Sequence, residues 1–213
     1  VQQCREELRS QAVGNALYGL KCMGDSEEVR QLIAALTPKV QECREELSSQ
    51  EVGNALYGLR RMYDSQEVRQ LLAALTPKVQ QCREELSSQA VGNALYGLQC
   101  MGDSQEVRQL LAALTPKVQQ CREELSSQAV GNALYGLQCM GNSQEVRQLL
   151  VALAPKVQEC QEELSSQAVG NALYGLQCMG DSKEVRQLLA ALTPKVQQCR
   201  EELDSQAVGN ALY

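Results

Sequence analysis

The segment Val79–Lys117 reads VQQCREELSSQAVGNALYGLQCMGDSQEVRQLLAALTPK, and near-copies of it fill the chain of 213 residues. The copies open at Val1, Val40, Val79, Val118, Val157 and Val196. Only 12 of the 39 aligned columns contain any substitution. A period of this size is typical of solenoids, in which each unit packs against its neighbours. We therefore expect one repeat array, 1–213, with units 1–39, 40–78, 79–117, 118–156, 157–195 and a partial unit 196–213.

The first half of each unit has the pattern of an amphipathic helix, which in the third unit covers Ser88–Met101. Apolar residues fall on one helical face at Val91, Ala94, Leu95, Leu98 and Met101. Ser87 precedes this face as a candidate N-cap, and in the second unit Glu51 follows Ser48 at the spacing of a capping box. Gly102 is expected to end the helix in the left-handed conformation.

The second half of each unit predicts another helix, opened by a capping box of Asp103 and Glu106. Its apolar stripe continues in phase past Pro116, at Val107, Leu110, Leu111, Leu114, Val118, Cys121 and Leu125. Proline in a helix interior costs about 3 kcal/mol, yet a true break has no reason to keep the phase. We therefore favour one helix, roughly Ser104–Leu125, kinked near Pro116. The alternative is three helices per unit, with Thr115 as the N-cap of the third.

Short turns between such helices predict an all-α fold, a right-handed α-solenoid of 39-residue helical hairpins. Gly92 and Gly97 lie inside the first predicted helix, where each costs about 1 kcal/mol of helix propensity. Close approach of neighbouring helices explains such a cost. The alternative is a shallow groove that admits the backbone of a ligand.

A polar stripe runs beside the apolar face of the first helix. In the third and fourth units its candidate contact residues are Gln89, Asn93, Tyr96, Asn132 and Tyr135. One interpretation is an asparagine ladder that bonds across stacked repeats, with tyrosine filling space. The other is a row of polar ligand contacts, one set per repeat.

The second unit departs from the pattern at its turn, where Arg60, Arg61 and Tyr63 stand. These residues either form a local basic spot or reflect sequence drift on an exposed corner. We interpret them as drift. Irregular substitutions of this kind indicate recent duplication rather than a designed consensus.

Composition excludes several kinds of site. The chain has 10 Cys, no His and a formal charge of −6. Without histidine, most zinc sites and all Ser-His triads are excluded, and we expect no metal, no cofactor and no enzymatic activity. Equivalent cysteines stack about 10 Å apart, too far for a disulfide, so we expect free thiols. Bonding between chains is the alternative.

The string SSQAVGNALYGLQCM resembles the first helix of octotricopeptide and heptatricopeptide repeats. The matching residues are Gly92, Asn93, Leu95, Tyr96, Gly97 and Leu98, with their equivalents in the other units. The resemblance implies an α-solenoid that binds RNA in chloroplasts or mitochondria. A code with one base per repeat needs side chains that differ between repeats. Here the contact columns do not change, so such an array could read only a homopolymer.

The sequence thus predicts a non-catalytic solenoid that acts as an interaction scaffold or a self-assembling structural protein. Its partners would be other proteins or copies of itself, stacked end to end in a filament-like array. RNA binding is the alternative function, which the acidic charge and the invariant repeats disfavour. No apolar run is long enough to cross a membrane, and we expect no membrane partner. We also expect the array to continue beyond the partial unit, or to stack on another copy.

Overall fold

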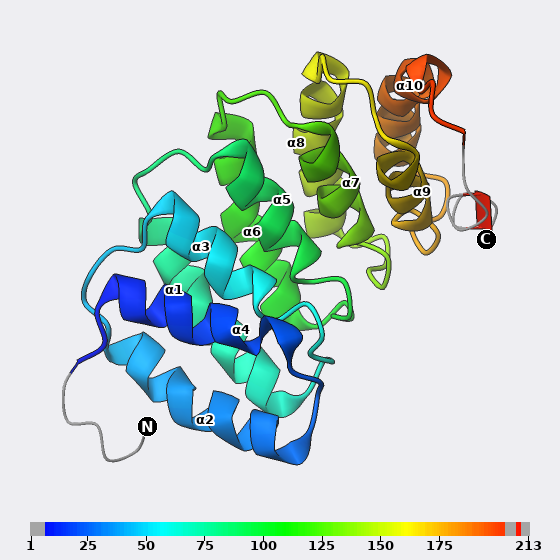
Figure 1. Ribbon diagram of the computed structural model, residues 1–213. Helices are drawn as coiled ribbons and strands as arrows, with labels where there is room; N and C mark the ends of the chain where they lie inside the picture. Colours follow the sequence, from blue (N-terminus) through cyan, green and yellow to red (C-terminus); the bar gives the residue numbers. More distant parts are fainter. Residues whose placement is uncertain (1–6, 203–207, 210–213) are drawn as a thin grey trace.

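The computed structural model describes residues 7–202 and 208–209, and this part of the chain is built from helices joined by short loops (Figure 1). A 3₁₀ turn, η1 (Gly19–Cys22), follows the first helix. The α-helices are α1 (Ser10–Tyr18), α2 (Glu27–Glu42), α3 (Ser49–Tyr57), α4 (Gln66–Gln81), α5 (Ser88–Tyr96), α6 (Gln105–Gln120), α7 (Ser127–Tyr135), α8 (Gln144–Glu159), α9 (Ser166–Tyr174) and α10 (Lys183–Gln198).

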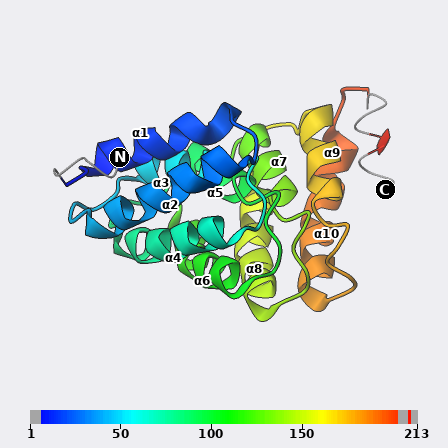
Figure 2. The ribbon, with the colours of Figure 1, turned by 90° about the horizontal axis from the view of Figure 1, so that it is seen from below.

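The helices form two layers. The short helices α1, α3, α5, α7 and α9 are called A helices below, and the long even-numbered ones B helices. Each A helix packs against the A helix of the next repeat, and each B helix against the next B helix. The two layers run side by side along the stack (Figures 1 and 2). The predicted α-solenoid is confirmed.

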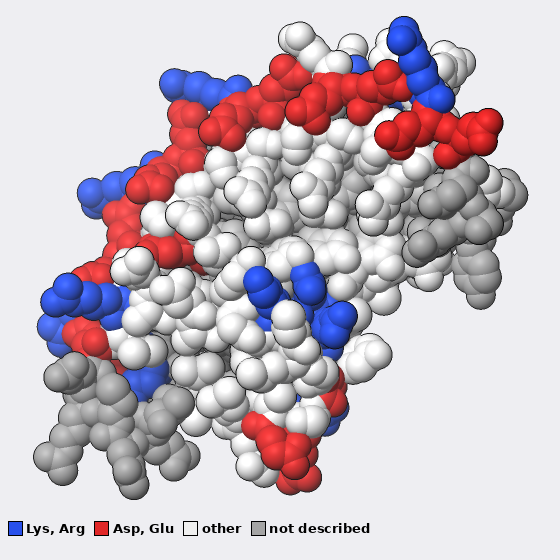
Figure 3. Space-filling view, in the orientation of Figure 1, with Lys and Arg blue, Asp and Glu red and all other residues white. Residues whose placement is uncertain are grey.

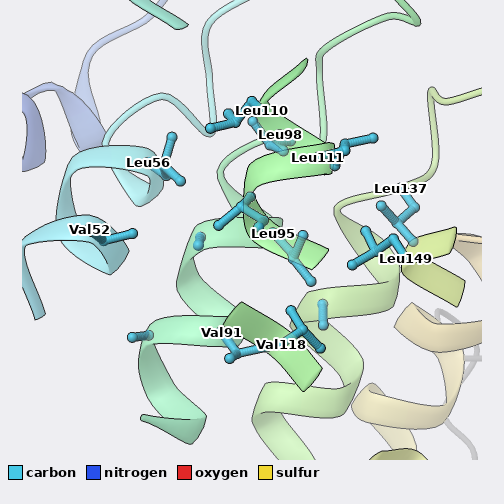
Figure 4. Close-up of a cluster of buried hydrophobic side chains, with 14 of the residues drawn as sticks. Val52, Leu56, Val91, Leu95, Leu98, Leu110, Leu111, Val118, Leu137 and Leu149 are labelled. Carbon is cyan, nitrogen blue, oxygen red and sulfur yellow. The ribbon is translucent and has the colours of Figure 1, made fainter. Parts of the chain in front are cut away.

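The core lies between the two layers and continues from repeat to repeat (Figure 4). In the third repeat Leu95 on α5 and Leu110 and Leu111 on α6 are completely buried. Each such side chain contributes about 1.5–3 kcal/mol through burial. Because Leu56 and Leu137 of the flanking repeats join the same cluster, no repeat closes its core alone.

The A helices are shorter than predicted. Helix α5 ends at Tyr96, and the chain continues in a tight turn in which the N–H groups of Leu98 and Met101 bond three residues back. The prediction that Gly102 stops the helix in the left-handed conformation is wrong. Among the described glycines only Gly180 has a positive φ, of 64°. The turn has already ended the helix, and Tyr63 occupies the same column without strain.

The B helices keep their proline inside. Pro116 lies within α6, so two helices per repeat are confirmed and the three-helix alternative is wrong. Proline leaves the carbonyl of Ala112 without a helical donor, but Ala112 is exposed and water can satisfy it. The hydroxyl of Thr115 donates to the carbonyl of Leu111 at 2.8 Å. Ala154 stands in this column of α8, which also contains a proline, so the helix does not depend on this back-bond.

Two predictions about the ends of the B helices are wrong. The N-cap of α6 is Ser104 and not Asp103, and it accepts a bond from the N–H of Val107 at 3.5 Å. The helix ends at Gln120 and does not reach Leu125, which nevertheless stays buried. The carbonyl of Cys121 instead accepts a bond from Lys156 Nζ of the neighbouring helix α8 at 2.6 Å. A cation at a helix C-terminus is stabilising, so the contact between repeats fixes the helix end.

The glycines of the A helices allow backbone contact between repeats. A Cβ on Gly92 would lie 2.8 Å from Cα of Ala129 in the next repeat. A Cβ on Gly97 would lie 2.0 Å from the carbonyl oxygen of Leu56 in the preceding one. The close-approach interpretation of these glycines is confirmed.

The nine cysteines in the described part of the chain are free, while Cys4 lies outside it. Cys43, Cys82, Cys121 and Cys160 are buried beside the core, as small apolar residues are. Burial raises the pKa of these four thiols.

Candidate functional site: the A-helix face

The outer surface of the A helices carries two hollows between neighbouring repeats. The larger, of about 690 Å³, lies over the first three A helices, and Asn15, Asn54 and Asn93 contribute to its lining. The smaller, of about 180 Å³, is lined by residues that include Gln89, Asn93 and Asn132. The structure therefore brings three of the predicted contact residues together in one surface.

One asparagine per repeat lines this surface, and we call Asn54, Asn93 and Asn132 the asparagine row. All three side chains are half-buried. The interpretation in which they bond to one another across repeats is not realised, because none of their amide groups has a hydrogen-bond partner among the described residues. Each amide offers two donors and one acceptor oxygen. The row therefore presents unused hydrogen-bonding groups at a fixed period.

A stack of tyrosines runs parallel to the asparagine row, one helical turn further along each A helix. It consists of Tyr18, Tyr57, Tyr96, Tyr135 and Tyr174. Neighbouring ring centroids lie 5.6–5.9 Å apart, with interplanar angles of 22–27°. Burial raises the pKa of Tyr96 and Tyr135, so both phenols remain neutral at physiological pH. This spacing leaves no room for another ring between two tyrosines.

Two basic side chains cover the first two rings of the stack. Lys21 Nζ lies 3.9 Å from the ring centroid of Tyr18, and Arg60 Cζ lies 4.5 Å from that of Tyr57. Arg60 Nη1 also donates to the hydroxyl of Tyr57. Contacts of this kind are cation–π interactions. Arg61, the other predicted basic residue, is exposed.

Sequence reasoning singled out Arg60 but missed Lys21. The signal was present in the repeat column that holds both residues, because the next three repeats carry Gln99, Gln138 and Gln177 there. In the later repeats the glutamine bonds to the preceding repeat: Gln99 Nε2 donates to the carbonyl of Arg60 at 2.7 Å, and Gln138 Nε2 to that of Gln99 at 3.0 Å.

A row of paired glutamates, called the acidic row below, runs along the other side of the face at the N-terminal ends of the A helices (Figure 3). It consists of Glu45, Glu46, Glu84, Glu85, Glu123, Glu124, Glu162 and Glu163. The first glutamate of each pair caps the preceding A helix, as where the N–H of Ser88 donates to Glu123 Oε2 at 2.7 Å. The second pairs with an arginine of the following repeat, as where Arg122 Nε lies 3.2 Å from Glu85 Oε1. The acidic row, the neutral asparagine row and the tyrosine stack thus lie side by side.

The described residues form neither a metal-binding cluster nor a membrane-spanning helix. Among the described residues, no group of three or more Cys, Asp or Glu side chains is arranged to hold a metal ion. Within the same residues, no helix combines the length and the apolar character needed to cross a membrane.

Comparison with solved structures gives the class of the fold. The chain is similar to a designed armadillo repeat protein, YIII(Dq)4CqI, with a TM-score of 0.59 and 19% identity over 99% of this chain and 93% of that one. It is also similar to computationally designed armadillo repeat proteins for modular peptide recognition, with a TM-score of 0.57 and 17% identity over 94% and 89%. At these identities the likeness shows the fold alone, a solenoid of helical repeats.

A family model also matches the sequence, over residues 58–137 and 135–211. The two matches start 77 residues apart (135 − 58), about two repeats of 39, so each covers a successive pair of repeats. Together the two matches span more than half of the chain. The chain therefore belongs to the family described as gag gene protein p17 (matrix protein).

No curated protein matches the chain. The helical-repeat fold implied by the octotricopeptide and heptatricopeptide resemblance is confirmed, while the resemblance to those two families in particular stays a prediction.

Proposed function

We propose that the chain is a non-catalytic binding scaffold whose A-helix face takes up an extended peptide segment of a partner protein. The observation that carries this proposal is the asparagine row, with its half-buried and unpartnered amides. Such amides can donate to and accept from one peptide unit at once, as the backbone of an extended chain requires. They contain no titratable group, so they support binding rather than acid–base or nucleophilic chemistry.

The period of the face supports an extended ligand. The tyrosine rings repeat every 5.6–5.9 Å. Two residues of an extended chain span about 6.4–6.8 Å. One repeat therefore faces about two residues of the ligand, and the accumulated mismatch over two repeats is about 1–2.4 Å. The similar designed armadillo repeat proteins were made for modular peptide recognition.

The proposal is tested with peptides selected from a random library on the wild-type chain. Substitution of Asn54, Asn93 and Asn132 by alanine should weaken the selected peptides by at least about tenfold, because each lost pair of hydrogen bonds costs about 1 kcal/mol or more. The matched control replaces Gln70, Gln109 and Gln148, exposed amides on the B helices, by alanine. Equal affinity of the two variants for the peptides would refute binding at the asparagine row.

Self-assembly is a second candidate, and one observation favours it. Leu189 on α10 is 39% exposed, whereas its equivalents Leu111 and Leu150 are completely buried by the following repeat. The matching surface of a second copy could cover it, as heterologous contacts do in filaments. Light scattering over a range of concentrations tests this: Leu189→Glu should abolish any growth in mass, and monodisperse wild-type monomers at high concentration would exclude self-assembly.

RNA binding is a weaker candidate. The closed tyrosine stack offers no gap for a base, and the acidic row would repel phosphates. Binding of single-stranded homopolymer RNA with a steep salt dependence would support it, and no binding at low salt would end it.

A further inference from the structure

We propose that Lys21 and Arg60 form an acid-recognition pair, which selects ligands carrying two acidic side chains separated by one residue and fixes their register on the face. The inference rests on the proposed peptide binding and names the class of peptide. The observation that supports it is that two basic side chains without an acidic partner lie over adjacent rings of the tyrosine stack.

The pair is positioned by the tyrosines. Lys21 lies over Tyr18 and Arg60 over Tyr57, and these rings lie 5.9 Å apart. Both basic side chains are half-buried. Their charged groups are therefore restrained near the surface, so less conformational freedom is lost on binding than for a free surface lysine.

Neither cation has an acidic partner. Neither Lys21 nor Arg60 forms an ion pair with another described residue, although the nearby turn carboxylates do: Asp64 pairs with Arg69 at 2.8 Å and Asp25 with Arg30 at 2.6 Å. Arg60 uses one N–H on the hydroxyl of Tyr57. Its remaining donors are free to bind a carboxylate, which guanidinium binds in a bidentate manner.

Stacking of the repeats does not need a basic residue in this column. Gln99 and Gln138 occupy it in later repeats and bond to the preceding repeat. The Tyr96–Tyr135 pair there stacks at 5.7 Å without a basic side chain in that column over either ring. The positive charge of Lys21 and Arg60 is thus a local addition to a surface that packs without it.

The spacing selects the ligand pattern. Alternate side chains of an extended peptide point to the same side at about 6.4–6.8 Å, close to the 5.9 Å between Tyr18 and Tyr57. Acidic residues at positions i and i+2 would therefore face Lys21 and Arg60 together. Figure 3 shows basic side chains gathered beside the uncharged band of this face, opposite the acidic row.

The same arrangement favours a peptide over a polyphosphate. A nucleic acid brings a charge with every nucleotide, and its other phosphates would lie against the acidic row. A peptide with two acidic residues brings negative charge only where the cations stand. The polar residues that line the hollows of the face are mainly asparagine, glutamine and serine, with Glu84 in the larger hollow.

The experiment compares two acetylated octapeptides that differ only in one motif, Glu-x-Glu or Gln-x-Gln, with neutral polar residues elsewhere. Their affinities are measured by fluorescence anisotropy at low and moderate salt, for the wild type and for a Lys21→Gln/Arg60→Gln variant. Glutamine is the residue that other repeats carry in this column, so circular dichroism should show an unchanged fold. The wild type should prefer Glu-x-Glu by about tenfold, and the variant should show no preference.

Two results would overturn the inference: equal binding of both peptides by the wild type, or a preference that survives in the variant. Binding of Gln-x-Gln that depends on the asparagine row, without any acid preference, would remove this inference and leave the proposed function standing. Binding of neither peptide would overturn both. An oligouridine that binds more tightly than Glu-x-Glu, and loses that affinity in the variant, would assign the pair to RNA instead.

Discussion

At the scale of the residue, contact between repeats decides what each position tolerates. Gly97 is fixed because the carbonyl oxygen of Leu56 occupies the place of its missing Cβ. Periodicity alone could place the glycines on a helix and suggest close approach. It could not show that Gly92 faces the following repeat while Gly97 faces the preceding one, because that depends on how the helices stack.

Substitution of Gly97 by alanine should lower the free energy of unfolding by about 1–3 kcal/mol, because the added Cβ would lie 2.0 Å from a backbone oxygen. Urea denaturation measures the change. Gly24→Ala is the control, since nothing lies within 4 Å of the Cβ there. Equal stability of the two variants would show that the repeats are not in backbone contact at Gly97.

The buried thiols should react slowly. Burial raises the pKa of Cys43 and Cys160, so a smaller fraction is thiolate at pH 8 than in a free cysteine. Alkylation of both should be slower than that of exposed Cys22, and should speed up as the pH rises above the ordinary thiol range. Tandem mass spectrometry separates the three, because they lie in tryptic peptides of different sequence and fragmentation distinguishes Cys160 from the exposed Cys178 in the same peptide. Equal rates in the folded protein would contradict their burial.

The asparagine and tyrosine columns could be predicted as a surface from their spacing. The hydrogen bonding of the asparagines and the stacking of the tyrosines could not be predicted in this way. The absence of bonds between asparagines and the closed stacking of the tyrosines depend on the distance between repeats, which is smaller at the rings than the expected 10 Å. Lys21 was missed because a single lysine at the end of a helix is usually a solvated side chain.

At the scale of the element, the sequence predicts the number and type of helices well and their ends poorly. The two apolar stripes correspond to α5 and α6. The prediction extended α6 to Leu125 because the apolar phase continues, whereas the chain leaves the helix at Cys121 and still buries Leu125. A lysine of the neighbouring helix α8 donates to the carbonyl at this boundary, a contact that a local pattern does not contain.

Replacing Lys117 by glutamine should destabilise the protein by about 1–2 kcal/mol, because its ammonium group donates to the carbonyl of Cys82 at the end of α4. The control is Lys183→Gln, an exposed position where other repeats carry glutamine or glutamate. Thermal unfolding compares the two. A larger loss for the control would exclude the helix-end role of the repeat lysine.

At the scale of the whole molecule, the stack is an array in which every internal repeat makes the same two contacts. Corresponding helices start 39 residues apart, from α1 to α9 and from α2 to α10. Stability is then close to a sum of repeat and interface contributions. The proposed division into 39-residue units follows from this reasoning and can be tested by deletion.

Deletion of residues 79–117 removes one whole unit and joins Lys78 to Val118, the Lys–Val junction found between all units. The shortened chain should keep its helix content per residue and unfold cooperatively at a lower temperature. Deletion of residues 79–98 removes only half a unit and should lose both properties. Circular dichroism during heating measures them, and similar behaviour of the two deletions would refute the unit boundaries.

The proposed peptide binding depends most on contact between the asparagine row and the ligand. The most direct measurement is an NMR titration of ¹⁵N-labelled protein with a selected peptide, with the side-chain amide signals of Asn54, Asn93 and Asn132 assigned from single alanine variants. These signals should shift with the peptide, while those of Gln70, Gln109 and Gln148 on the B helices should not. A peptide that binds and shifts only the B-helix amides would contradict it.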